Sequence, residues 1–123
     1  MNCPKCQSTF QTTLMRNAVM VDVCTGCEGV WLAQGEINFF IKDTKKLNKY
    51  YNNGINQAMS CIDKCPTCDG TFLRKGALPE FSFEIEECPK CFGIFLDKKE
   101  IETLNNSRDV NKFTPDKRVQ HTN

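Results

Sequence analysis

The stretch CTGCEGVWLAQGEI at residues 24–37 is followed later in the chain by a second version of the same pattern, CPKCFGIFLDKKEI at residues 88–101. At an offset of 64 positions, six of the fourteen residues are identical. Two further pairs, Val30 with Ile94 and Trp31 with Phe95, are similar in size and polarity. The repetition predicts two copies of one structural unit in a chain of 123 residues.

Eight of the nine cysteines form four Cys-x-x-Cys pairs, and 17 residues separate the first two pairs while 19 separate the last two. Both separations lie in the range typical of a structural zinc site. A gap of two residues lets a tight turn, here called a knuckle, direct two sulfurs at one point. The longer gap accommodates a hairpin that returns the second knuckle, so that four thiolates complete a closed tetrahedron. We therefore predict two zinc ions per chain, bound by Cys3, Cys6, Cys24 and Cys27 and by Cys65, Cys68, Cys88 and Cys91.

The small size of each unit and the cysteine content point to the same chemistry. Units of about 40 residues bury too little apolar surface to be stable alone and usually need a metal, disulfides or a partner. The sequence has no apolar run long enough to cross a membrane, and no signal peptide precedes Cys3. We therefore expect a cytoplasmic protein without membrane contact, in which thiols stay reduced and closely spaced cysteines bind metal.

The segments between the knuckles have the composition of β-hairpins. In the first unit, Phe10–Leu14 and Val19–Val23 are rich in β-branched and apolar residues. In the second, apolar and polar residues alternate over residues 81–86, as in a half-buried strand, and Gly76 and Pro79 are expected in the preceding turn. Each unit is thus predicted to run knuckle, strand, turn, strand, knuckle, which is the order of a zinc ribbon.

A helix is predicted after the second knuckle of each unit. Asp97 followed three residues later by Glu100 is a capping-box pattern, with Asp97 as the N-cap. The first unit keeps Glu36 but has Ala33 where Asp97 stands, so it lacks the capping oxygen. Apolar residues at helical spacing still predict a helix there: Ile37, Phe40, Ile41, Leu47 and Tyr51.

The predicted fold class is therefore a small zinc-stabilised α+β protein. It consists of two tandem zinc ribbons with rubredoxin-like knuckles and a β-hairpin, each followed by a helix. We place the first ribbon and its helix at residues 1–47, and a helix end and linker at 48–62. The second ribbon with a short helix occupies 63–104, and a polar tail expected to be flexible occupies 105–123.

The motif CPKC at residues 3–6, combined with VDVCTGCEGVWLAQGEI at residues 21–37, resembles the transcription-factor-IIB-type zinc-ribbon family of small bacterial proteins. Members of that family typically read CPxC, a hairpin, and then V-D-x-C-P-x-C-G-G-x-W-L-D-x-G-E-L. The resemblance covers Cys3 to about Phe40, and a second copy covers Cys65 to about Leu104. It implies the same two sets of four zinc ligands and no reaction, because a fold does not by itself specify a function.

The sequence departs from the family pattern at four positions, none of which is a ligand. Glu28 and Phe92 replace the first glycine after the knuckle, Ala33 replaces the aspartate, and Phe95 replaces the tryptophan. Metal binding is therefore expected in both copies.

Charge bears on the choice of partner. Residues 1–60 sum to +2 from six basic and four acidic residues, residues 61–104 sum to −3 from six and nine, and the tail sums to +2. Each zinc with four thiolates adds −2, so the zinc-loaded chain is near −3 and its second ribbon near −5. Phosphate neutralisation dominates nucleic-acid affinity, so this balance does not favour a nucleic-acid reader.

We therefore expect a non-catalytic interaction module that binds a protein partner, with transcription as the context that the resemblance implies and with no small-molecule substrate. The alternatives are a nucleic-acid-binding protein, a zinc-thiolate redox sensor and a rubredoxin-like iron electron carrier. An enzyme is not expected, because the sequence offers no catalytic histidine, no glycine-rich phosphate loop and no open metal position. Candidate contact residues are Trp31, Lys42, Lys45, Lys46 and Lys49.

The ninth cysteine, Cys61, lies outside the four pairs. Three roles are open to it: a small buried apolar residue, a reactive surface thiol, or a substitute zinc ligand.

Overall fold

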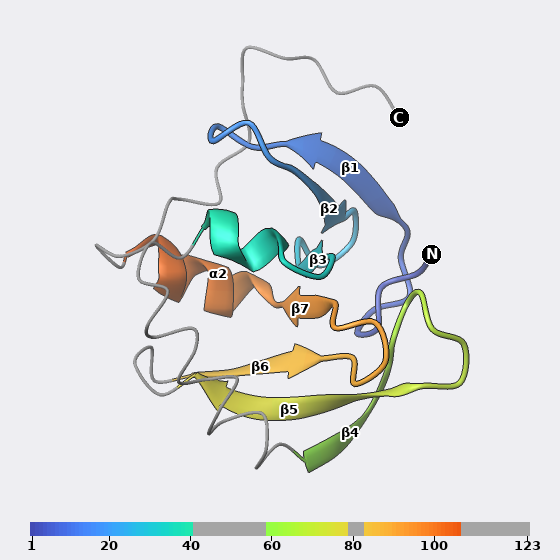
Figure 1. Ribbon diagram of the computed structural model, residues 1–123. Helices are drawn as coiled ribbons and strands as arrows, with labels where there is room; N and C mark the ends of the chain where they lie inside the picture. The colour runs from blue at the N-terminus through green and yellow to red at the C-terminus, as the bar shows by residue number, and fades with distance from the viewer. Residues whose placement is uncertain (41–58, 79–82, 107–123) are drawn as a thin grey trace.

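The computed structural model describes residues 1–40, 59–78 and 83–106 of the chain. These residues form one seven-stranded sheet in the order β1-β2-β3-β7-β6-β5-β4 (Figure 1). All neighbouring strands are antiparallel. The strands are β1 (Phe10–Leu14), β2 (Met20–Cys24), β3 (Val30–Leu32), β4 (Met59–Lys64), β5 (Phe72–Leu78), β6 (Phe83–Glu87) and β7 (Ile94–Leu96).

The two repeats are the two halves of this sheet. Strands β1, β2 and β3 form the first ribbon, and strands β4 to β7 form the second. The halves meet where β3 pairs with β7. These are the two short apolar strands that follow the second knuckle of each repeat. The outer strand β4 has no full counterpart in the first ribbon, where only an isolated bridge between Asn2 and Thr9 is found.

The apolar strands at this junction are buried on both faces. Alternate residues of β3 belong to two clusters: Val30 and Leu32 to one, and Trp31 to the other. The first cluster lies between the sheet and the two helical segments, η1 (Glu36–Phe39) and α2 (Lys98–Asn105), around which the sheet curls in Figure 1. The second cluster contains the cysteine knuckles. The helical side is formed by Met15, Val21, Val30, Leu32, Ile37, Phe40, Ile85, Ile94, Leu96, Ile101 and Leu104.

The helical segments differ as the capping residues predict. The Asp97 carboxylate accepts a 2.7 Å hydrogen bond from the Glu100 backbone N–H, and the Asp97 N–H donates a 2.9 Å bond to the Glu100 carboxylate. This complete capping box begins an α-helix of eight residues. In the first ribbon, the Ala33 N–H donates a 2.5 Å bond to Glu36 Oε1, but no side chain returns a bond. Only half of the box is present there: the Glu36 N–H donates a 3.0 Å bond to the Ala33 carbonyl oxygen instead of to a side chain. The segment that follows is a single 3-10 turn, whose N-cap is Gly35.

Of the helix predicted after the first ribbon, the described residues contain only this 3-10 turn. The predicted continuation through Ile41, Leu47 and Tyr51 lies outside the described residues, as do most of the predicted linker and nearly all of the predicted tail.

The structure differs from the sequence-based expectation in the second hairpin. Strand β4 begins at Met59, inside the segment predicted as linker. Gly76 lies within β5, opposite Ile85, rather than in the turn. Glu86 was expected on a solvated face, but it is only 5% exposed and the following Glu87 is fully buried. Hydrophobic periodicity does not reveal the burial of these two carboxylates, because they pair with basic side chains from other segments of the chain.

The capping difference leads to a paired prediction. Replacing Ala33 with aspartate should offer the Glu36 N–H a side-chain acceptor in place of the Ala33 carbonyl oxygen and stabilise the zinc-loaded protein by up to about 1 kcal/mol. Replacing Asp97 with alanine should destabilise it by a similar amount. Chemical denaturation of both variants, each with two zinc ions bound, measures the two changes. No gain for Ala33→Asp together with a full loss for Asp97→Ala would contradict the idea that the missing oxygen limits the first helical segment.

Candidate metal centre

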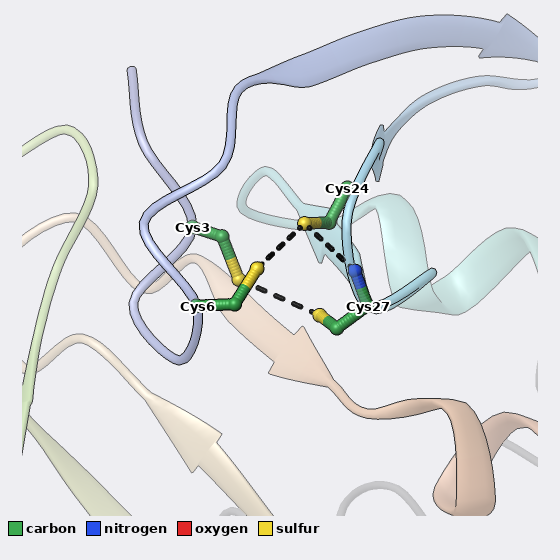
Figure 2. Close-up of side chains that lie close together, drawn as sticks. All are labelled: Cys3, Cys6, Cys24 and Cys27. Atoms are coloured by element: carbon green, nitrogen blue, oxygen red, sulfur yellow. Dashed lines mark hydrogen bonds between the residues drawn. The ribbon is translucent and has the colours of Figure 1, made fainter.

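The first candidate metal site joins two loops of the first ribbon. Cys3 and Cys6 belong to the knuckle before β1, Cys24 ends β2, and Cys27 lies in the turn between β2 and β3. Figure 2 shows the four side chains converging on one point. Their sulfur atoms lie within 4.8 Å of one another, with 3.7 Å between Cys3 and Cys27 and 3.3 Å between Cys6 and Cys24.

These distances fit a tetrahedral zinc ion. A zinc–sulfur bond of about 2.3 Å gives sulfur–sulfur edges of about 3.8 Å in a regular tetrahedron. Backbone N–H groups also face the sulfurs, since Lys5 N lies 3.4 Å from Cys3 Sγ and Gly26 N lies 3.3 Å from Cys24 Sγ. Donors directed at sulfur favour the thiolate form, which is the form that binds metal.

The second site repeats this arrangement with Cys65, Cys68, Cys88 and Cys91, whose sulfurs also lie within 4.8 Å of one another. Cys65 Sγ and Cys91 Sγ are 3.6 Å apart. The N–H groups of Cys68 and Lys90 lie 3.2 Å from Cys65 Sγ and 3.3 Å from Cys88 Sγ. The Thr67 hydroxyl lies 3.4 Å from Cys91 Sγ. The predicted ligand sets are thus brought together in two separate groups, which are compatible with two zinc ions.

The four thiols of each site differ in acidity. Desolvation raises the pKa of Cys3 and of Cys88 to about 12, so these two thiols need a compensating charge to ionise near neutral pH. Hydrogen bonds lower the pKa of Cys6 to about 6 and, against the effect of burial, that of Cys91 to about 7. A zinc ion supplies that charge when bound, and its uptake releases the thiol protons.

The structure explains why the family pattern has a glycine directly after the second knuckle. Glu28 and Phe92 occupy this position in the two copies, and both adopt left-handed backbone conformations, with φ of 64° and 61°. Glycine adopts this conformation without steric cost, whereas other residues are strained there. The backbone geometry of the knuckle is retained in both copies despite the substitution.

Trp31 is not a surface residue. Its side chain is only 3% exposed and packs with Phe95 among the buried cysteines of both sites. The hypothesis that Trp31 is an exposed contact for a partner is therefore not supported, because the second ribbon already covers it. The other candidate contacts, Lys42, Lys45, Lys46 and Lys49, lie outside the described residues.

Cys61 belongs to neither group of four sulfurs. Its half-buried thiol lies 3.2 Å from the Leu73 carbonyl oxygen, to which it donates, and burial raises its pKa. These properties favour a packed, unreactive cysteine over a substitute ligand or a reactive thiol.

Ion pairs between the two ribbons were not anticipated from the sequence. The Lys5 ammonium, in the first knuckle, pairs with the carboxylates of Asp63 and Glu86. Lys98 pairs with Glu28 at 2.6 Å, also across the two ribbons. Lys5 occupies one of the two positions between the paired cysteines of its Cys-x-x-Cys motif. The sequence alone does not indicate that this position faces the second ribbon, because that depends on the topology of the sheet.

Comparison with known protein families gives a match over the first ribbon. Residues 2–43 match a family model described as a transcription factor zinc-finger, of the TFIIB zinc-ribbon type. This confirms the resemblance over the first ribbon. Searches among curated proteins and among solved structures give no match. No helix in the part of the chain that the structure describes is long and apolar enough to cross a membrane.

Two complete ligand sets predict two zinc ions and little iron in elemental analysis of the purified protein. Structural zinc contributes roughly 10–16 kcal/mol of apparent binding energy in small zinc domains. A strong chelator should therefore unfold the protein, with loss of amide dispersion in NMR spectra. A red iron-loaded native form would favour the electron-carrier alternative, and spectra unchanged by complete zinc removal would show that metal does not hold the fold.

Proposed function

We propose that this protein, whose residues 2–43 match a TFIIB-type zinc-ribbon family model, is a non-catalytic zinc-binding module that binds a protein partner. The observation that carries the proposal is a cleft between the first knuckles of the two ribbons, in which a few apolar side chains stand among polar ones. The family description supports transcription as the setting in which to look for the partner.

The cleft has a volume of about 620 Å³ and lies where residues 1–7 approach residues 62–66. Pro4 and Pro66, the prolines of the two knuckles, line it from opposite ribbons together with Ile62. Ile62 is 90% exposed, so almost its whole side chain is accessible to a partner. Asp63 and Lys64 give the rim charges of both signs. These features suit an apolar side chain of a partner protein, surrounded by polar contacts.

The adjacent strand supplies further binding groups. Among the described residues β4 pairs only with β5, so it forms one edge of the sheet. An edge strand offers unpaired backbone N–H and C=O groups, which an extended segment of another protein can use. The proposed partner therefore presents an extended segment that inserts an apolar side chain beside Ile62.

A catalytic role is not proposed for either metal site. Each has four protein sulfurs around one point, and four protein ligands leave no coordination position for a substrate or an activated water.

A substitution at the cleft tests the proposal. A photoreactive residue at position 62 should crosslink a specific protein in host cells, and the same residue at position 20 should not. Met20 provides the matched control because it is 50% exposed and lies on β2 rather than at the cleft. Once that protein is purified, Ile62→Asp should weaken its binding at least tenfold by calorimetry, whereas Met20→Asp should have little effect. Equal binding by wild type and Ile62→Asp would reject the cleft as the contact.

The nucleic-acid alternative has a separate test. The second ribbon is acidic once zinc is bound, so DNA affinity would have to come from lysines outside it. Such binding should be weak, should fall steeply with salt and should discriminate little between sequences. A titration with random and selected DNA at low and moderate salt measures this. Tight, salt-resistant and sequence-selective binding would move the protein to the nucleic-acid class.

A further inference from the structure

The junction of the two ribbons is built around equivalent residues. In the β3–β7 pair, Trp31 lies directly opposite Phe95, its counterpart at the repeat offset of 64. On either side, Val30 faces Leu96 and Leu32 faces Ile94. Each of these flanking pairs is the counterpart of the other, so the ribbons are related by a pseudo-twofold axis through the Trp31–Phe95 pair.

The two aromatic rings cross this axis. The Trp31 ring lies against Gly93, where an added Cβ atom would be 2.2 Å from Trp31 Cζ2. The Phe95 ring lies in the same way against Gly29, where an added Cβ would be 2.4 Å from Phe95 Cζ. Only glycine allows either approach. Each ribbon therefore places its aromatic side chain on a glycine of the other ribbon.

These glycines belong to the loops that carry the metal ligands. Gly29 follows Cys27 by two residues, and its carbonyl oxygen accepts a 2.8 Å hydrogen bond from the Cys24 N–H. The corresponding bond from the Cys88 N–H to the Gly93 carbonyl is 2.9 Å. Trp31 and Phe95 share one buried cluster with a cysteine from each of the four knuckles: Cys3, Cys24, Cys65 and Cys88. The cover of each metal site thus includes a ring from the other ribbon.

From this exchange we infer that the two zinc sites are energetically coupled, so that zinc at one site strengthens zinc binding at the other. A zinc ion holds its two knuckles together and so fixes the β3 or β7 strand that follows. The fixed strand delivers its ring to the opposite ligand loop, and the ordering cost of that loop falls before the second zinc arrives. Trp31 and Phe95 act as positioning residues, since neither binds metal. The inference rests on the zinc sites and not on the proposed protein partner.

The population of half-loaded chains tests the coupling. Native mass spectrometry of the full-length protein at one zinc equivalent per chain counts molecules with zero, one and two ions. Two independent sites at half saturation place at least about half of the molecules in the one-zinc state, whatever their individual affinities. Tenfold positive coupling lowers that fraction to about a quarter when the sites are otherwise equal. We expect a quarter or less in wild type, reached both by adding zinc to the apoprotein and by partial chelation. A one-zinc fraction of half or more would overturn the inference.

Two variants assign the coupling to the rings. Trp31→Ala should raise the one-zinc fraction to half or more while two zinc ions still bind at saturation. Trp31→Phe, which copies the residue found at position 95, should keep the fraction low. Met20→Ala, at an exposed position on β2, serves as the matched control. If Trp31→Ala no longer folds, the wild-type populations alone decide whether coupling exists. A low one-zinc fraction in folded Trp31→Ala would reject the rings as its carriers.

Discussion

The convergence of four cysteine sulfurs in each ribbon is the constraint on which this fold depends. Burial raises the pKa of Cys3 and of Cys88 to about 12, yet a tetrahedral metal site requires thiolates at both positions. The zinc charge and the backbone N–H groups directed at sulfur offset that desolvation together. Because each ribbon has few apolar residues of its own, its hairpin and its knuckles gain their definition from the metal.

Metal alone would give two separate ribbons, and the β3–β7 pair makes them one structure. The residues of this pair serve two layers at once: Val30 and Leu32 pack toward the helical segments, while Trp31 packs toward the cysteines. Ion pairs from Lys5 and Lys98 cross the same boundary. Exposed pairs such as Lys98 with Glu28 contribute little stability, so the apolar junction is the main link.

Local signals in the sequence were sufficient for the parts of the fold that local chemistry determines. The eight ligands follow from spacing, the hairpin of the first ribbon from composition, and the capping difference between Asp97 and Ala33 from one oxygen atom. What spacing could not provide was the relation between the repeats. The sequence predicts Trp31 as a candidate contact residue, and its burial becomes evident only when β7 is placed beside β3. The burial of Glu86 likewise depends on Lys5, which is 81 residues away in the sequence.

The pseudo-twofold junction has the geometry of an isologous homodimer, in which one patch binds its own copy. Here both patches belong to one polypeptide. Covalent linkage replaces a bimolecular encounter with an intramolecular one. The association is therefore insensitive to dilution. Covalent linkage also frees the two patches from identity, so that tryptophan can face phenylalanine and only one half needs to carry the additional edge strand β4.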